Sequence, residues 1–409
     1  MAKRVIVVGG GPAGMLAAYG AATSGAEAVL LEQNEKLGKK LFITGKGRCN
    51  ITNDSTVEEL IQNVTRNPRF LYSAFYAFSS DAIVALLEEN GLRTKVERGK
   101  RVFPASDKSS DVIKTLEKIL NKAHVHVRFN KQVAEILHKE GSVLGVKLAD
   151  GEKIMADCVI MATGGVSYPS TGSNGSGFVM ARKMGIELKE LCPGLIAMEE
   201  QGDTCVKLQG LTLKNVSLTL WEDKKQVFQQ QGELLFTHFG ISGPLVLTGS
   251  MYVQDPARLT AEIDLKPALT PEKLDARLLR DLEENRNKAF KNIVGGLVPG
   301  KLQGVLMEKC LIDPECKGNS ITKAQRLEMG RFLKHFAIPI SGFRPIGEAI
   351  ITRGGVEVGQ INPSTMESKR IKGLFFAGEM IDVDAKTGGF NLQIAYSTGY
   401  LAGITAASQ

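Results

Sequence analysis

The chain has 409 residues, of which 43% are hydrophobic and 23% are charged, and its formal net charge at neutral pH is +7. This length allows two or three domains, and the composition excludes a disordered or fibrous protein. Basic residues are scattered along the chain, whereas nucleic-acid binders gather them in a patch or stripe. No apolar run has the length of a bilayer span, and the N-terminus lacks the apolar region of a secretory signal. We therefore expect a cytoplasmic protein with no nucleic-acid or membrane partner.

The cysteines give no sign of a metal site or of a redox pair. No two of them have the C-x-x-C spacing, and no Cys/His cluster has the spacing of a zinc site. We expect no metal, and reduced thiols at Cys49, Cys158, Cys192, Cys205, Cys310 and Cys316.

The N-terminal stretch predicts a strand, a helix and a second strand. The apolar run Val5–Val8 is followed by Met15–Ala22, whose small residues are typical of a helix packed closely on a sheet, and then by the apolar run Ala28–Leu31. This alternation indicates an α/β fold.

A dinucleotide-binding fingerprint joins these elements. Gly9, Gly11 and Gly14 form G-x-G-x-x-G, and Glu32 follows the second strand. Gly9 would make the turn, Gly11 would let the backbone approach a pyrophosphate, and Gly14 would let the helix pack on the strand. Free N–H groups at the helix N-terminus would bind phosphate, and the Glu32 carboxylate would accept hydrogen bonds from a ribose diol. The sequence therefore predicts a nucleotide site.

Composition divides the rest of the chain. Residues 55–122 are mainly helical, with a hairpin suggested at 92–104, and the apolar run Cys158–Ala162 predicts a central strand that delivers Gly164 and Gly165 to a ligand. After about residue 190 the pattern becomes β-rich, and from Pro271 it becomes helical. We predict a nucleotide-binding domain formed by residues 1–190 and 341–409, and an inserted β-rich and helical domain at 191–340.

The C-terminal segment favours FAD over NAD. The apolar run Leu374–Ala377 leads into Gly378 and Glu379, and a carboxylate at a strand end can bind ribityl hydroxyls. Gly388 and Gly389 open the last helix, which starts near Asn391. The positive end of this helix would stabilise a reduced, anionic flavin ring.

Residues 38–52, GKKLFITGKGRCNIT, allow three interpretations. A P-loop fails, because Lys40 stands where the first glycine is required and Gly47 stands where a hydroxyl is required. A redox disulfide fails, because Cys49 has no partner cysteine nearby. A lone Cys49 nucleophile beside the cation of Arg48 lacks an evident histidine to activate it.

The favoured interpretation is a flavin loop. Gly45 and Gly47 would allow close approach to the ring or the pyrophosphate, Arg48 would neutralise phosphate charge, and Asn50 would donate to a carbonyl edge. Cys49 would be a small packed neighbour of the flavin.

Across essentially its whole length, the sequence resembles the bacterial flavoproteins of the BaiN and aminoacetone-oxidase type. The motifs that carry the resemblance are GGGPAG at 9–14, TGKGRCNIT at 44–52, ATGG at 162–165, GELLFTHFGISGP at 232–244, INPSTMESK at 361–369 and AGEMIDVDAKTGGFNLQ at 377–393. The resemblance implies non-covalent FAD in a glutathione-reductase-like Rossmann domain that is interrupted by a β-barrel-like and helical insert. By motif match it implies flavin contacts from Ala13, Glu32, Arg48, Val133 and Glu379, with the Val133 backbone holding adenine.

Motifs and resemblance together predict one cofactor site. Its expected members are Gly9, Gly11, Ala13, Gly14, Glu32, Gln33, Lys40, Gly45, Gly47, Arg48, Cys49, Asn50, Val133, Gly164, Gly165, Gly378, Glu379, Gly388, Gly389, Phe390, Asn391 and Leu392.

The resemblance implies an FAD-dependent oxidoreductase with a small-molecule substrate. The leading hypothesis is a reductase that passes hydride from NAD(P)H through flavin N5 to the conjugated C=C bond of a 3-oxo-Δ4 bile-acid or steroid-like enone. NAD(P)H would dock transiently, because no second G-x-G-x-x-G follows. The alternatives are an aminoacetone-type amine oxidase that produces hydrogen peroxide, and a flavin-binding or nucleic-acid-binding regulator.

The sequence assigns no catalytic residue and indicates no oligomeric state. His238 and Tyr168 are candidates to polarise a ketone or to supply a proton. A loop histidine satisfied by its neighbours and a packing tyrosine explain these residues equally well.

Overall fold

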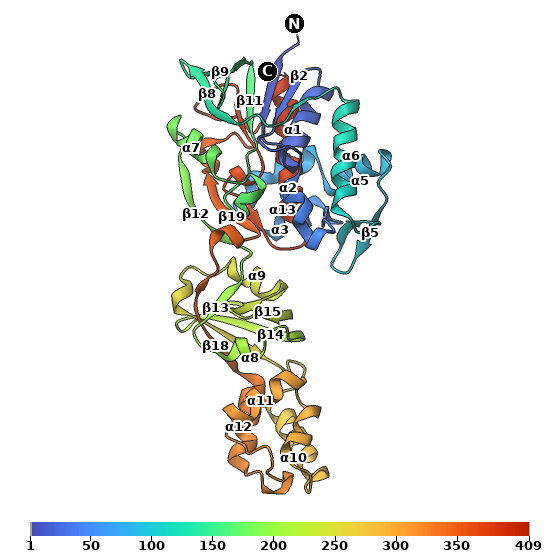
Figure 1. Cartoon of the computed structure of the whole chain (residues 1–409), viewed down its shortest axis with the longest axis vertical. Coiled ribbons are helices and arrows are strands. Elements are labelled where there is room, and N and C mark those ends of the chain that lie inside the picture. The colour runs from blue at the N-terminus through green and yellow to red at the C-terminus, as the bar shows by residue number, and fades with distance from the viewer. Residues whose placement is uncertain (1, 409) are drawn as a thin grey trace. The chain divides into compact units, whose positions relative to one another are not determined.

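Figure 1 shows the computed structural model of the chain, which describes residues 2–408. The chain divides into two compact units: unit 1 comprises Met1–Gly194 and Ile346–Gln409, and unit 2 comprises Leu195–Pro345. Each unit has its own hydrophobic core. The antiparallel pair β12 (Leu188–Gly194) and β19 (Ile351–Val356) belongs to unit 1. Strand β12, which directly precedes unit 2 in the sequence, is therefore part of unit 1.

Unit 1 is built on a five-stranded parallel sheet with the order β20-β11-β1-β2-β7. Its strands are β1 (Arg4–Val8), β2 (Glu27–Leu31), β7 (His126–Arg128), β11 (Cys158–Met161) and β20 (Leu374–Phe376). Val5, Ile6 and Val7 in the central strand are fully buried, as expected for a parallel sheet that is covered on both faces. The strands predicted near residues 5, 28, 158 and 374 are thus confirmed.

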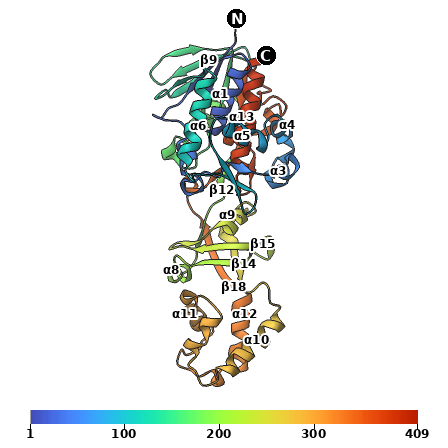
Figure 2. The same cartoon turned by 90° about the vertical axis from the view of Figure 1, so that its right-hand side faces the viewer.

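Two helices with almost no polar face pack side by side in unit 1 (Figures 1 and 2). They are α1 (Pro12–Thr23) and α13 (Phe390–Ser408). A Cβ atom built on Gly399 would lie 2.1 Å from the carbonyl oxygen of Ala13, and one on Gly403 would lie 2.1 Å from that of Ala17. The helices therefore touch backbone to backbone, and only glycine fits at these two positions.

Shorter elements complete unit 1. Helix α6 (Ser109–Lys122), in the stretch expected to be helical, buries one apolar face that includes Val112, Leu116 and Ile119. The predicted hairpin is present as β5 (Thr94–Glu97) and β6 (Arg101–Pro104), which form a small sheet with β3 (Thr52–Asn53). The remaining elements are α2 (Lys39–Ile43), α3 (Val57–Asn63), β4 (Val64–Arg66), α4 (Tyr72–Ala77), α5 (Ser80–Glu89), β8 (Val133–Lys139), β9 (Ser142–Leu148), β10 (Lys153–Met155), α7 (Ser176–Lys183) and β21 (Asp384–Ala385).

Unit 2 combines a closed six-stranded barrel with helices, as the insert was expected to do. The barrel order is β13-β16-β15-β14-β17-β18. Its strands are β13 (Met198–Glu200), β14 (Thr212–Glu222), β15 (Lys225–Phe236), β16 (Gly240–Ser242), β17 (Leu259–Asp264) and β18 (Phe336–Phe343). Its helices are α8 (Thr204–Lys207), α9 (Pro244–Ser250), α10 (Pro271–Glu284), α11 (Gly300–Lys309) and α12 (Lys323–Lys334). Helix α10, which begins at Pro271 as the helical pattern predicts, buries Leu274, Leu278 and Leu282 on one face.

Among the described residues, one helical stretch, Pro68–Glu89, has the length and hydropathy of a membrane span. It is broken into separate helical pieces, and its Leu71, Phe75 and Ile83 are buried in the core of unit 1. A helix in the core of a protein can have this length and hydropathy without crossing a membrane.

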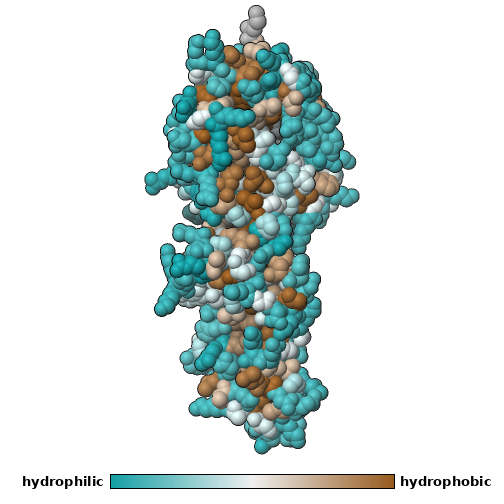
Figure 3. Space-filling model, turned by 60° about the vertical axis from the view of Figure 1, so that its left-hand side comes forward, coloured by the Kyte–Doolittle hydropathy of each residue, from teal (hydrophilic) through white to brown (hydrophobic). Residues whose placement is uncertain are grey.

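Hydrophilic side chains predominate on the face of the molecule in Figure 3, with apolar ones interspersed.

Candidate cofactor site

A cavity in unit 1 lies at the carboxyl edge of the parallel sheet. Val8, Leu31, Ala162 and Ala377 line it, and each stands at or just after the end of a parallel strand. In open α/β sheets, ligands bind in the crevice at this edge. The fold therefore places the cavity where a dinucleotide would lie.

The glycine fingerprint forms the floor of the cavity and leaves free space beside Gly11. Gly9 has a φ of +107°, and a Cβ there would lie 2.5 Å from the carbonyl oxygen of Ala162. A Cβ on Gly14 would lie 1.8 Å from the carbonyl oxygen of Gly9. A Cβ on Gly11, by contrast, would meet no atom within 4 Å. Gly9 and Gly14 are thus required by the protein itself, while Gly11 faces free space beside the N-terminus of α1, where a pyrophosphate fits.

Glu32 is fixed beside this floor by three hydrogen bonds. Its Oε2 accepts the Gly10 N–H at 2.6 Å, and its Oε1 accepts the backbone N–H of Asn34 at 2.8 Å and the side-chain amide of Asn34 at 2.7 Å. Glu32 is only 7% exposed and lines the cavity. A carboxylate held in this way can receive the hydroxyls of a ribose without rearranging.

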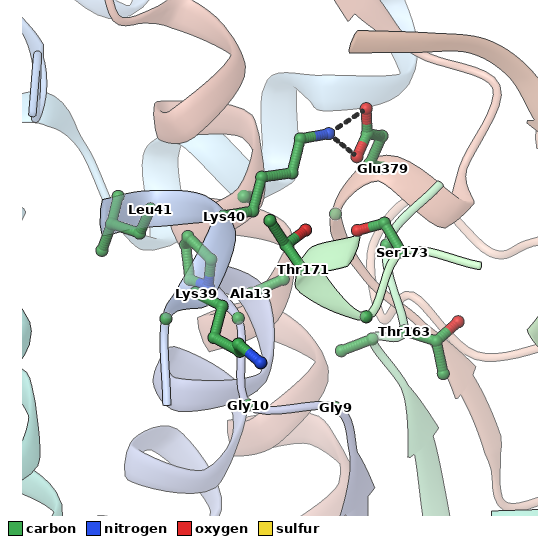
Figure 4. Close-up of a pocket in the computed structure, with 18 of the residues that line it drawn as sticks. Gly9, Gly10, Ala13, Lys39, Lys40, Leu41, Thr163, Thr171, Ser173 and Glu379 are labelled. Atoms are coloured by element: carbon green, nitrogen blue, oxygen red, sulfur yellow. Dashed lines mark hydrogen bonds and ion pairs between the residues drawn. The ribbon is translucent and has the colours of Figure 1, made fainter. Parts of the chain in front are cut away.

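A second carboxylate, Glu379, joins distant parts of the chain at the cavity wall (Figure 4). The Lys40 ammonium lies 2.8 Å from Oε2 and 3.1 Å from Oε1 of Glu379. The backbone N–H of Thr352 donates to Oε1 at 2.6 Å, and Lys40 also donates to the Ser167 hydroxyl at 2.7 Å. Glu379 follows β20 in the chain, so this network stands at the edge of the sheet, where ribityl hydroxyls would lie.

The last helix begins at the same cavity. Gly388 and Gly389 have φ values of +129° and +99°, and α13 begins at Phe390. Asn391 holds the preceding turn, because its amide donates to the Ala385 carbonyl at 2.7 Å and its oxygen accepts the Ala385 N–H at 2.9 Å. The first turn of α13 thus presents its positive end to the cavity.

The structure gathers one part of the predicted site around the cavity. Its lining contains Gly9, Gly11, Ala13, Glu32, Gln33, Lys40, Val133, Gly164, Gly378, Glu379, Asn391 and Leu392. The other predicted residues are not in the lining: Gly14, Gly45, Gly47, Arg48, Cys49, Asn50, Gly165, Gly388, Gly389 and Phe390. Gly14 and Gly165 lie outside the lining but pack against residues within it. A Cβ on Gly165, for example, would lie 2.2 Å from the Thr352 hydroxyl.

In the loop that follows α2, Arg48 is occupied by neighbours other than a phosphate. Its guanidinium pairs with the carboxylates of Glu97 and Asp107, and it lies 4.2 Å from the centroid of the Phe103 ring. These hydrogen bonds, to Glu97 first and then to Asp107, raise the pKa of Arg48. Arg48 therefore fastens the loop to the β5–β6 hairpin.

Cys49 is fully buried, and burial raises the pKa of its thiol to about 12, against a smaller opposing hydrogen bond from Thr44. At neutral pH it is a thiol and not a thiolate, which argues against a nucleophile. The Asn50 side-chain oxygen is buried without a hydrogen-bond partner. That orphaned acceptor is the one feature of the loop that calls for a further donor.

Several lining residues escaped the sequence analysis. Gly10, Lys39 and Thr163 lie inside motifs quoted from the sequence but were not singled out, and the others belong to no motif: Asn34, Lys131, Thr171, Ser173, Ile350 and Thr352. Their signal was position alone, since several of them follow a strand or the predicted glycine turn. The two candidates for polarising a ketone or supplying a proton do not line this cavity: Tyr168 is in unit 1 outside the lining, and His238 is in unit 2, against the ring of Phe239.

The two carboxylates, the open floor at Gly11 and the two helix N-termini fit FAD. Residues 3–405 match the model of the HI0933-like protein Rossmann domain family. The chain is 31% identical over its full length to the whole of the 3-dehydro-bile acid Δ(4,6)-reductase of Clostridium scindens. It is 28% identical to the ribosomal RNA dihydrouridine synthase of Haemophilus influenzae, over 99% of this chain and 98% of that protein.

Solved structures share the fold at lower identity. The 3-ketosteroid-Δ4-(5α)-dehydrogenase of Rhodococcus jostii RHA1 has a TM-score of 0.54 at 16% identity, over 100% of this chain and 97% of that chain. A flavocytochrome c3 fumarate reductase has a TM-score of 0.54 at 18% identity, over 99% and 78%. Unit 1 is thus a Rossmann-type FAD-binding domain, and the chain belongs to the HI0933-like family.

Proposed function

We propose that this FAD-dependent oxidoreductase reduces a C=C bond that is conjugated with a carbonyl group, with a 3-oxo steroid-like enone as the leading substrate. One observation supports this most: two full-length relatives with unlike substrates are named for this same reaction class. A Δ(4,6)-reductase of a 3-dehydro bile acid reduces double bonds conjugated with a 3-oxo group. A dihydrouridine synthase saturates the C5=C6 bond of uracil, which is conjugated with the C4 carbonyl.

The residues of unit 1 would hold the cofactor in a defined order. Glu32 would bind a ribose, the backbone at Gly11 and the N-terminus of α1 would bind the pyrophosphate, and Glu379 with Lys40 would bind the ribityl chain. The N-terminus of α13 would then lie at the flavin ring. When bound, FAD supplies the two-electron redox chemistry.

The reaction needs two further groups from the protein: a hydrogen-bond donor that polarises the carbonyl of the substrate, and an acid that protonates the neighbouring carbon. Cys49 is unsuited to proton transfer at neutral pH, because burial raises the pKa of its thiol to about 12. NAD(P)H is the proposed electron donor, docking transiently, because the chain carries one dinucleotide fingerprint.

A second candidate substrate is uracil within RNA. It is favoured by the relatives from Haemophilus influenzae and Escherichia coli that are named ribosomal RNA dihydrouridine synthases, the latter being 27% identical over 97% of this chain. The chemistry at the cofactor would be the same, and only the group presented to it would differ.

The test is anaerobic reduction of the purified flavoprotein by NADH or NADPH, followed by mixing with single acceptors. The acceptors are a 3-oxo-Δ4 steroid, a uridine-containing RNA and aminoacetone with oxygen. Reoxidation coupled to loss of the enone or of the uracil absorbance supports the proposal. Hydrogen peroxide formed in step with amine consumption, with neither C=C bond reduced, would identify an amine oxidase and refute it.

A further inference from the structure

Basic residues are spread along the chain, but their excess over acidic residues is concentrated in two short segments. Residues 35–48 contain five Lys or Arg and one Glu, and residues 93–108 contain six Lys or Arg and two acidic residues. The two segments together carry a formal charge of +8, whereas the whole chain carries +7. The rest of the chain is therefore close to neutral overall, and these two segments carry the net charge that would attract a polyanion.

The fold brings the two segments together on one surface. The first includes α2 and the loop after it, and the second includes the β5–β6 hairpin. Strand β3, just beyond the loop, pairs with β6, and the Arg48 guanidinium joins the loop to Glu97 and Asp107 of the hairpin segment. The expectation of no nucleic-acid partner rested on the spread of basic residues along the chain, and it did not take this juxtaposition into account.

Part of the charge on this surface is left without a counter-ion. Arg48, Lys95, Lys100, Lys39 and Lys40 are engaged by carboxylates. No salt bridge within residues 2–408 involves the exposed cations Lys36, Lys46, Arg93, Arg98, Arg101 and Lys108. A set of unpaired cations on a rigid scaffold can bind several phosphates at once.

Apolar side chains are exposed among these cations. Phe42 is 52% exposed and Ile43 is 41% exposed at the end of α2, and Val96 is 57% exposed on the hairpin. An exposed aromatic ring beside cations is a typical stacking platform for an unpaired base. α2 has only five residues, too few for an amphipathic helix that lies in a membrane surface.

The same short helix connects the surface to the cofactor cavity. Lys39, Lys40 and Leu41 line the cavity, and Phe42 and Ile43 follow at once on the exposed side. Figure 4 shows the side chains of Lys39, Lys40 and Leu41 at the cavity wall. A chain bound along the surface would therefore run beside the cofactor cavity.

We propose that the surface formed by residues 35–48 and 93–108 binds the phosphate backbone of single-stranded RNA, with Phe42 stacking on a base, and so delivers RNA to the cavity. The inference rests on the proposed C=C reduction in its uracil form. The partner is RNA rather than an anionic membrane, because the exposed apolar residues among the cations are few and α2, with five residues, is too short to lie in a membrane surface.

The test measures binding of a fluorescently labelled, uridine-rich single-stranded RNA to the FAD-loaded protein at several salt concentrations. The variant is Arg93→Gln/Arg98→Gln/Lys108→Gln, and the matched control is Lys153→Gln/Lys224→Gln/Lys225→Gln, which removes the same charge from exposed positions elsewhere. Each lost phosphate contact lowers the slope of log K against log salt by about 0.7, so three lower it by about 2 and weaken binding roughly 100-fold at 0.1 M salt.

The outcomes separate this surface from the proposed reaction. Loss of slope in the surface variant but not in the control supports the inference. Equal binding by the two variants, or binding of anionic phospholipid vesicles without binding of RNA, overturns it. Reduction of a small 3-oxo enone is measured on the unsubstituted protein and on both variants: if the unsubstituted protein reduces the enone but binds no RNA, the surface assignment fails and the proposed reaction stands. If RNA binds through the surface but neither uracil nor enone is reduced, the proposed reaction fails.

Discussion

The backbone contact between α1 and α13 predicts that Gly399→Ala destabilises unit 1. Replacing a glycine inside an exposed helix by alanine ordinarily stabilises a protein by up to about 1 kcal/mol, because alanine loses less conformational entropy. At Gly399 the new Cβ would lie 2.1 Å from the Ala13 carbonyl oxygen and 2.9 Å from its carbonyl carbon. Backbone atoms cannot rotate away as a side chain can, so the helices must separate.

Overpacking of a well-packed interior typically costs about 1–3 kcal/mol. Setting the helical gain of up to about 1 kcal/mol against the upper part of that range leaves a net loss of about 1–2 kcal/mol. For a unit of this size that corresponds to a fall of about 2–8 °C in the unfolding temperature. Because Ala13 and the first turn of α13 line the cavity, the affinity for FAD should fall as well.

The assay uses two signals that report on different units. Flavin release on heating follows unit 1, and the fluorescence of Trp221, the one tryptophan of the chain, follows unit 2. Gly399→Ala should lower the temperature of flavin release and leave the Trp221 transition in place. The control is Gly304→Ala in α11, where a Cβ meets no atom within 4 Å and a small stabilisation of the Trp221 transition is expected. Flavin release at an unchanged or higher temperature in Gly399→Ala would refute the backbone contact.

Four further predictions follow from the site and its surroundings. Glu379→Ala leaves the Lys40 ammonium and the Thr352 N–H without their acceptor, so FAD should bind about tenfold to a hundredfold more weakly in a fluorescence titration, and unchanged affinity would contradict the assigned role. Cys49→Ser should keep its flavin and most of its turnover, because the buried thiol with a pKa of about 12 takes no part in the reaction; full flavin content without turnover would restore the nucleophile hypothesis. Arg48→Ala should speed hydrogen exchange in residues 44–50 and loosen FAD, whereas unchanged exchange would show that the ion pairs do not hold the loop. Hydrogen bonds from Arg128, and then from Lys131, lower the pKa of the Glu152 carboxyl to about 2. The stabilisation by this carboxylate is therefore complete above about pH 4.5 and is lost as the pH falls towards 2. The unfolding temperatures of wild type and Glu152→Gln should converge over that interval in low salt, and parallel curves would contradict the stabilising role of Glu152.

The parts of the site that sequence predicted well are those whose function depends on neighbours in the chain. Gly9, Gly11, Gly14 and Glu32 lie within one strand–helix–strand unit, so their spacing already determines their geometry. The loop at 44–50 shows the limit of such reasoning. Its glycines and its cation suggested phosphate, but the partners of Arg48 come from a hairpin about fifty residues further along the chain, and only the folded chain places Glu97 and Asp107 there.

The sequence also could not predict which site residues far apart in the chain contact one another. Lys40 and Glu379 were each expected at the cofactor, yet their ion pair joins positions 339 residues apart and required the order of strands in the sheet. The lining residues Thr171, Ser173 and Thr352 belong to no motif and contribute short side chains or backbone groups. Periodicity and motif spacing do not register such residues, whereas strand and helix positions were predictable from apolar runs.

The interruption of unit 1 by unit 2 determines when the cofactor cavity can exist during synthesis. Strands β1, β2 and β11 leave the ribosome before the insert, while β20, Glu379 and α13 leave it about two hundred residues later. At about 5–20 residues per second this is a delay of about 10–40 s, during which the barrel unit, contiguous in sequence, can fold by itself. In that interval the buried residues of α1 lack the helix that covers them, and a cell that makes this protein must keep them from aggregating until the last helix arrives.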